Sequence, residues 1–234
     1  MKTIGLIGGM SWESSLEYYR KINQEISQRL GGLHSAKIIM ESLDFHEIEE
    51  FQRSGQWHNA GRILADSAKR LEKAGADFIL ICTNTMHRVA PQVQTCINIP
   101  LVHIADAMGE KITQSGHNTL LLLGTCFTME HDFLKGRLNE KFNLDIIIPG
   151  NKQRRLINDI IFKELCLGRI NPDSKKIFLQ IIESMKHRAV SAVILGCTEI
   201  GLLVKDGDVS LEVFDSTALH CMKAVELACH GLKP

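Results

Sequence analysis

The sequence predicts an α/β protein of two similar lobes, each a short and mostly parallel sheet flanked by helices. Short apolar runs alternate with longer stretches of helical periodicity, which is typical of parallel sheets covered by helices. The whole pattern restarts about 115 residues further along, and internal repetition of this kind indicates two related halves. One continuous sheet of eight strands is the alternative.

The first half contains four predicted strands and two predicted helices. The first helix has capping-box spacing at Ser14 and Glu17. It carries Leu16 and Tyr19 among the residues of its apolar stripe, and Gly31 ends it. The predicted strands are Thr3–Ile7, Lys37–Leu43, Phe78–Ile81 and Leu101–Ile104, and the predicted helices are Ser11–Leu30 and Asn59–Ala74.

The second half repeats this order of elements. Its first strand ends in Gly124-Thr125, as the first strand of the chain ends in Gly8-Gly9. The predicted strands are Thr119–Leu123, Leu144–Ile148, Ala192–Leu195 and Leu211–Phe214, and the predicted helices are Arg155–Leu167, Pro172–Lys186 and Ser216–Cys229.

Charge and cysteine content exclude several classes of protein. The 234 residues include 27 basic and 27 acidic side chains, whereas nucleic-acid binding calls for a basic surplus. No run of about 18 apolar residues predicts a membrane span. The seven cysteines are an odd number without C-x-x-C spacing, which argues against a disulfide scaffold and a zinc site. We therefore expect a cytoplasmic protein with reduced thiols and no nucleic-acid or membrane partner.

Small polar residues follow the predicted strands, where open parallel sheets bind ligands. Among them, Cys82 and Cys197 hold corresponding places in the two halves, each directly before a threonine. One thiol on each side of a shared cleft would remove a proton from one face of a carbon and return it to the other. Thiols suit this task because their pKa, about 8.5 when free, falls readily in polar surroundings. The alternative for either cysteine is a small core residue.

The same segments resemble the aspartate/glutamate racemase family, which works without pyridoxal. The resemblance rests on IGLIGGMSWESS at 4–15, ILICTNTMH at 79–87, LLGTCFTME at 122–130 and VILGCTEIGLL at 193–203. It implies a site between two α/β lobes, residues 1–104 with 209–234 and residues 105–208, and a homodimer. It also implies Cys197 as the catalytic thiol. The residues that it places at the substrate are Met10, Ser11, Asn84, Thr85, Thr125, Thr128, Thr198 and Glu199.

The second proton carrier depends on the register at the end of the third strand. Many family members have the thiol directly before Asn-Thr, whereas this chain reads Cys82-Thr83-Asn84-Thr85. Alignment on Asn84 puts Thr83 at the catalytic position, and alignment of the two halves puts Cys82 there. Adjacent residues of a strand point to opposite faces, so only one can serve. We favour Thr83, because Asn84 must reach the substrate.

The resulting hypothesis is cofactor-independent racemisation of aspartate or glutamate at the α-carbon. No lysine follows a predicted strand to form a Schiff base, so we expect neither pyridoxal nor a metal. Gln52, Arg53 or Lys163 could recognise the distal carboxylate of the substrate. One alternative is a related thiol-dependent racemase or isomerase of another amino acid, a hydantoin or a diacid. The other is a non-catalytic amino-acid-binding protein.

Overall fold

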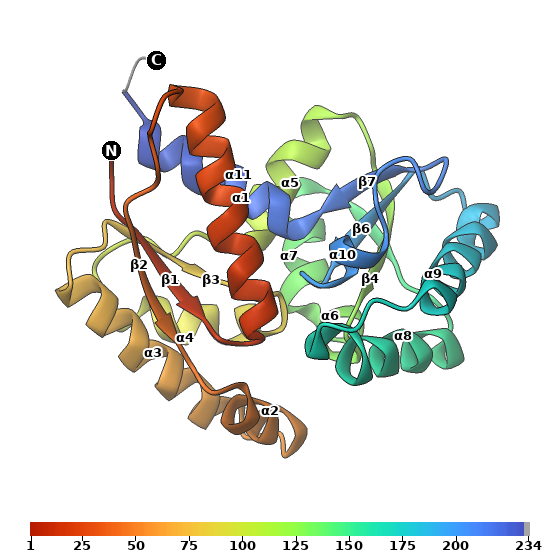
Figure 1. Cartoon of the computed structure of the whole chain (residues 1–234). Coiled ribbons are helices and arrows are strands. Elements are labelled where there is room, and N and C mark those ends of the chain that lie inside the picture. Colours follow the sequence, from red (N-terminus) through yellow and green to blue (C-terminus); the bar gives the residue numbers. More distant parts are fainter. Residues whose placement is uncertain (232–234) are drawn as a thin grey trace. The chain divides into compact units, whose positions relative to one another are not determined.

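The structure, a computed structural model, describes residues 1–231 as two compact units with one parallel sheet each (Figure 1). One unit comprises Met1–Ile104 and the C-terminal segment that begins at His220, and the other comprises Ala105–Leu219. Every strand pair in both sheets is parallel, and helices flank the strands. The predicted fold class is therefore confirmed.

The two sheets share the arrangement of their central strands. The first has the order β2-β1-β3 and the second the order β5-β4-β6-β7, so β1 and β4 hold equivalent places, as do β3 and β6. The strands are β1 Ile4–Gly8, β2 Ile38–Ser42, β3 Phe78–Ile81, β4 Thr119–Gly124, β5 Asp145–Ile147, β6 Ala192–Gly196 and β7 Glu212–Asp215. The predicted strands agree with these within one or two residues, apart from the segment 101–104.

Helices and short 3-10 turns make up most of the remaining chain. The sequence pattern missed α2, α4, α5, α6, α7 and α10, because short stretches between polar loops carry a weak periodic signal. The helical elements are α1 Trp12–Leu30, α2 Phe45–Arg53, α3 Trp57–Lys73, η1 Thr85–Val89, α4 Ala90–Gln94, α5 Ile104–Gln114, α6 Cys126–Glu130, α7 Asp132–Phe142, α8 Asn151–Lys163, η2 Leu165–Leu167, α9 Pro172–Met185, η3 Lys186–Arg188, α10 Ile200–Leu203 and α11 Ser216–Cys229.

The predicted strand over 101–104 is wrong. Leu101 forms a single bridge to Ile79 of β3, and Ile104 already begins α5. Only two backbone hydrogen bonds join the segment to β3, from Val102 N to Ile79 O and from Ile79 N to Pro100 O. The turn into α5 leaves no room for a longer ladder.

The apolar face of α1 also differs from the predicted one. Tyr18, Ile22 and Ile26 are fully buried, whereas Leu16 and Tyr19 are 52% and 50% exposed. The cap of this helix is Ser11, whose Oγ accepts the N–H of Ser14, and not Ser14 itself. The buried stripe of α1 therefore runs through Tyr18, which packs in the cluster with Ile4 and Leu6 of β1.

Both faces of the first sheet are covered by apolar packing. The α1 and α11 side packs Ile4 and Leu6 of β1 and Leu80 of β3 against Tyr18 and Val225. On the opposite side, residues of α3 cover the alternate positions of the same strands; these are Ile7, Ile79 and Ile81 packed with Leu64, Ala68 and Leu71. Strands β1 and β3 accordingly consist of apolar residues and glycine alone, as in sheets buried on two faces, whereas β2 ends in Glu41 and Ser42.

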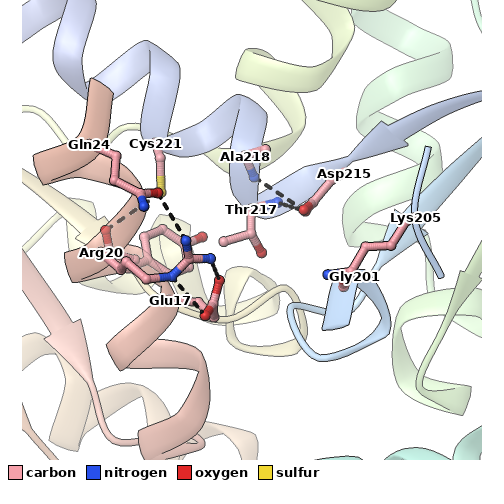
Figure 2. A network of polar contacts seen from close by, with 10 residues as sticks. Glu17, Arg20, Gln24, Gly201, Lys205, Asp215, Thr217, Ala218 and Cys221 are labelled. Carbon is pink, nitrogen blue, oxygen red and sulfur yellow. Dashed lines mark hydrogen bonds and ion pairs between the residues drawn. The ribbon is translucent and has the colours of Figure 1, made fainter. Parts of the chain in front are cut away.

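The boundary between the two units falls within α11, between Leu219 and His220. Asp215, the last residue of β7, accepts the N–H groups of Thr217 and Ala218 and so caps the helix (Figure 2). Strand β7 pairs with β6, so residues 209–219 belong to the second unit, whereas the sequence prediction groups them with the first lobe.

Figure 2 also shows Arg20 of α1 bound to Glu17 and Gln24. No helix of the described residues is long and apolar enough to cross a membrane.

Candidate active site

The turn from β1 to α1 holds Met10 and Ser11 at the carboxyl end of the strand. Gly9 begins the turn with a φ of +87°, and a Cβ there would lie 2.1 Å from the backbone oxygen of Leu43. Only glycine fits this approach. The N–H of Gly9 donates to Ser15 Oγ at 2.7 Å. Met10 and Ser11 follow this constrained residue and are both buried.

The loop after the neighbouring strand β3 carries the two candidates for the second proton carrier. Cys82 is fully buried, and its thiol packs in the apolar cluster that contains Leu6, Tyr18 and Leu80. Burial raises the pKa of this thiol well above its usual range. Thr83 is partly exposed. The two adjacent residues therefore have different environments, and the thiol is the one in hydrocarbon.

Three further predicted residues gather at the same loop. Asn84 and Thr85 are buried where η1 begins. Gln52 arrives from α2, is buried, and donates from Nε2 to the sulfur of Met86 at 3.0 Å. Its Oε1 accepts no hydrogen bond from any residue between 1 and 231. An unsatisfied buried oxygen is costly, so this atom is suited to receive a donor from a ligand.

The equivalent turn of the second unit, between β4 and α6, contains two of the predicted threonines. Thr125 caps α6, and its Oγ1 accepts the N–H of Thr128 at 3.2 Å. The two hydroxyls lie 3.1 Å apart, and both side chains are buried. The hydroxyl pair thus follows β4 as Met10 and Ser11 follow β1.

The loop after β6 brings a thiol and a carboxylate into contact. The Cys197 thiol donates to Oε2 of Glu199 with Sγ and Oε2 2.9 Å apart. Cys197 is 9% exposed, and Thr198 and Glu199 are buried. Burial, and then the negative charge of Glu199, raise the pKa of Cys197 well above its usual range. The sulfur is consequently held as a thiol with a proton acceptor beside it.

A second thiol, which the sequence did not single out, contacts the same carboxylate. Cys166 of η2 points its Sγ at Oε1 of Glu199, at 3.7 Å. Burial, together with the charge of Glu199, raises the pKa of Cys166 as well. The sequence contains no signal for this contact, because 33 residues separate the two side chains and Cys166 follows no strand. Glu199 is thus bound between two thiols.

The two predicted cations lie on helices and already have partners. Arg53 pairs with Glu49 at 3.7 Å, and Lys163 pairs with Asp159 at 2.8 Å, each one turn away on its own helix. Both side chains are well exposed. Of the residues suggested for the distal carboxylate, Gln52 is the one adjacent to a strand-end loop.

The part of the chain that the structure describes offers no metal site, and a depression on its surface lies apart from the predicted site residues. Among residues 1–231, no group of three histidine, cysteine, aspartate or glutamate side chains is arranged to hold a metal ion. A surface depression of about 580 Å³ lies in the second unit against α9, η3 and residues 207–210, and its lining includes none of the predicted site residues.

The chain is similar to several known racemases and racemase homologues. A Yersinia pestis protein assigned to the Asp/Glu racemases is 48% identical, with a TM-score of 0.91 over 98% of this chain and 100% of that one. An aspartate racemase homologue from Pyrococcus horikoshii OT3 is 40% identical, with a TM-score of 0.85 over the same shares of the two chains. The broad specificity amino-acid racemase RacX of Bacillus subtilis is 22% identical over 67% of each chain.

A family model gives the same assignment along most of the chain. The model of the Asp/Glu/Hydantoin racemases matches residues 7–224, which includes all four strand-end loops described above. The family's enzyme class is that of amino-acid racemases, which are isomerases. The chain belongs to the Asp/Glu/Hydantoin racemase family.

Proposed function

We propose that the protein racemises an acidic amino acid, aspartate or glutamate, by moving a proton at the α-carbon without a cofactor. The observation that carries the proposal is the contact of the buried Cys197 thiol with Glu199, at 2.9 Å. A thiol beside an acceptor carboxylate can become the thiolate that abstracts a proton. The family of the chain and its relatives among the aspartate racemase homologues favour this substrate class.

In the proposed mechanism, Glu199 first takes the proton of Cys197 and leaves a thiolate. The thiolate removes the α-proton of the substrate, so that an S–H bond forms as the C–H bond breaks. Thr83 then donates its hydroxyl proton to the opposite face of the carbon. Glu199 returns its proton to solvent and Thr83 regains one, which restores the starting protein. We give Glu199 this role, and not substrate binding, because its negative charge would repel a substrate carboxylate.

The choice of Thr83 as the second proton carrier is supported by its environment. Thr83 is partly exposed, whereas Cys82 packs among Leu6, Tyr18 and Leu80. A thiol in hydrocarbon would have to ionise without solvation or a charged partner, which is costly. A threonine hydroxyl is in turn a weaker acid than a thiol, so we expect different kcat and KM values for the two enantiomers. The ratio of the two kcat/KM values must still equal one, because the equilibrium constant between the free enantiomers is one.

The substrate carboxylates need fixed donors, since the strand-end loops supply no lysine. We propose that hydroxyls, an amide and backbone N–H groups hold them, and that these groups stabilise the anionic intermediate. The residues assigned to this task are Met10, Ser11, Gln52, Asn84, Thr85, Thr125, Thr128 and Thr198.

Hydrogen exchange in heavy water tests the proposal directly. Incubation of the protein with L-aspartate or L-glutamate should give α-deuterated substrate and the D-enantiomer, followed by NMR and chiral chromatography. Cys197→Ser serves as the matched variant, because it keeps a hydroxyl donor to Glu199 but lacks the acidic thiol. Absence of α-deuterium with both acidic amino acids would reject this substrate class, and parallel incubations with other amino acids and a hydantoin would identify a related one.

A further inference from the structure

The buried imidazole of His87 binds the backbone of Thr83. Its Nδ1 lies 2.8 Å from the carbonyl oxygen of Thr83, and its Nε2 lies 3.1 Å from the backbone nitrogen of Ile104. The Ile104 N–H can only donate, so Nε2 accepts and the ring proton must be on Nδ1. Nδ1–H therefore donates to Thr83 O. The two contacts together select one neutral tautomer of His87.

Three consecutive carbonyls of the Thr83 loop are fixed in this way. Ser14 Oγ donates to Cys82 O at 2.6 Å, and the backbone N–H of His87 donates to Asn84 O at 3.0 Å. His87 therefore supplies two of the three donors, and the middle carbonyl, that of Thr83, receives its side chain. The backbone on both sides of the partly exposed Thr83 is thereby held in place.

His87 is itself supported by a cluster of buried aromatic rings. The centroid of its ring lies 4.7 Å from that of His103 and 5.6 Å from that of His220. His220 donates from Nε2 to Val102 O at 2.9 Å and accepts the hydroxyl proton of Tyr18 at Nδ1, at 2.8 Å. The support thus comes from α1, from α11 and from the segment before α5.

We propose that His87 is a positioning residue that aims the hydroxyl of Thr83 at the α-carbon of the substrate. This inference rests on the proposed function. A threonine hydroxyl is a weak acid, so its transfer of a proton depends on placement more than that of a thiol does. A displacement of about 1 Å at a reacting group can cost about 100-fold in rate. A neutral ring that holds the Thr83 carbonyl prevents such a displacement.

Two substitutions separate the two contacts of the ring. In His87→Asn the side-chain amide can take the place of Nδ1–H and donate to Thr83 O. In His87→Gln the side-chain oxygen can reach the place of Nε2 and accept from Ile104, while the donor to Thr83 is lost. Both substitutions are neutral and polar. His34→Gln, at an exposed position outside the predicted site, is the matched control.

The readout is the ratio of deuterium exchange with retention to racemisation, for each enantiomer of the substrate in heavy water. When Thr83 cannot deliver its proton, Cys197 still removes the α-proton of one enantiomer and returns a solvent deuteron to the same face. We expect His87→Gln to behave as Thr83→Ala does, with racemisation reduced by about 10- to 100-fold and retained exchange in one enantiomer. His87→Asn should keep a larger share of racemisation, and His34→Gln the wild-type ratio.

A parallel fall of exchange and racemisation in both His87 variants, with a constant ratio, would overturn the inference and leave His87 a purely structural residue. Should His87→Gln fail to fold, His87→Ala replaces it, because it also lacks the donor to Thr83 O: a ratio shifted towards retained exchange supports the inference, and the wild-type ratio overturns it. Failure of the proposed function is distinct from all of these outcomes, because the wild-type protein would then exchange no α-proton at all.

Discussion

The Cys197 sulfur lies 2.9 Å from a carboxylate oxygen of Glu199, in a loop where both side chains are buried. A buried anion next to a thiol opposes ionisation of the thiol, and yet it is also the nearest group able to take the proton. Cys197 is therefore held in its protonated form, and Glu199 can accept that proton to leave a basic thiolate.

Glu199→Gln should change thiol reactivity and catalysis in opposite directions. Loss of the negative charge removes one cause of the raised pKa of Cys197, so alkylation by iodoacetamide should begin at lower pH. Racemisation should fall by about 100-fold or more, because the acceptor of the thiol proton is gone. Mass spectrometry of the Cys197 peptide across a pH series measures the first effect. Slower alkylation in the variant would contradict the assigned role of Glu199.

Thr83→Ala and Cys82→Ala should have different consequences. The first should lower racemisation by about 100-fold or more, since it removes a proton carrier. The second should retain catalysis and lower the free energy of unfolding by about 1–2 kcal/mol, because it leaves a small cavity in the apolar cluster under α1 and α11. Steady-state kinetics and urea denaturation measure the two effects. A dead Cys82→Ala variant beside an active Thr83→Ala variant would exchange the two roles.

His220 should make the stability of the protein depend on pH. Burial, and then the neighbouring ring of His87, lower the pKa of His220 from 6.5 to about 3. Below pH 6.5 the unfolded chain binds a proton that the folded protein does not. The free energy of unfolding should therefore fall as the pH falls from 6.5 towards 3, by up to about 1.4 kcal/mol per pH unit.

Urea denaturation of the wild-type protein and of His220→Asn over this pH range measures the effect. The variant lacks the titrating ring, so its free energy of unfolding should depend less steeply on pH. The difference in slope should correspond to about one proton. His34→Gln, which removes an exposed imidazole, should leave the slope unchanged. Equal slopes in His220→Asn and the wild type would show that another group is responsible.

Asp106→Asn should destabilise the second unit. Burial opposes ionisation of Asp106, but hydrogen bonds from Arg137 and Lys141 outweigh it and lower the pKa to about 2. The carboxylate thereby joins α5 to α7, with contacts of 2.6 to 2.8 Å. At neutral pH we expect a loss of about 1–3 kcal/mol in the free energy of unfolding.

The pH dependence of that loss provides the check on Asp106. The stabilisation is present above the ordinary pKa of 3.8 and disappears as the pH falls towards about 2. The difference between wild type and Asp106→Asn in denaturation experiments should shrink over the same range. The solvent-exposed pair of Lys176 and Asp173 is the matched control, and Asp173→Asn should change the free energy of unfolding far less than Asp106→Asn does.

Periodicity in the sequence was sufficient to predict the parallel sheets, because strands buried on both faces are continuously apolar and are followed by small polar residues. The strand Phe78–Ile81 and the helix Ser216–Cys229 have the predicted bounds. Short elements escaped prediction, since a helix such as α2 offers too few turns for its period to stand out. The segment 101–104 has the short apolar run of a strand, but only Leu101 bridges to β3 and Ile104 already begins α5.

The sequence by itself determined the fold class, the strand ends where small polar residues gather, and the motifs that resemble the racemases. It left open whether Cys82 or Thr83 is accessible, because alternation along a strand separates the two side chains without naming the face that is covered. Tertiary structure decided this, since α1 and α11 bury the Cys82 side of β3. It also brought Cys166 to Glu199 and fixed the tautomer of His87, because both depend on hydrogen-bonding partners that only folding brings into contact.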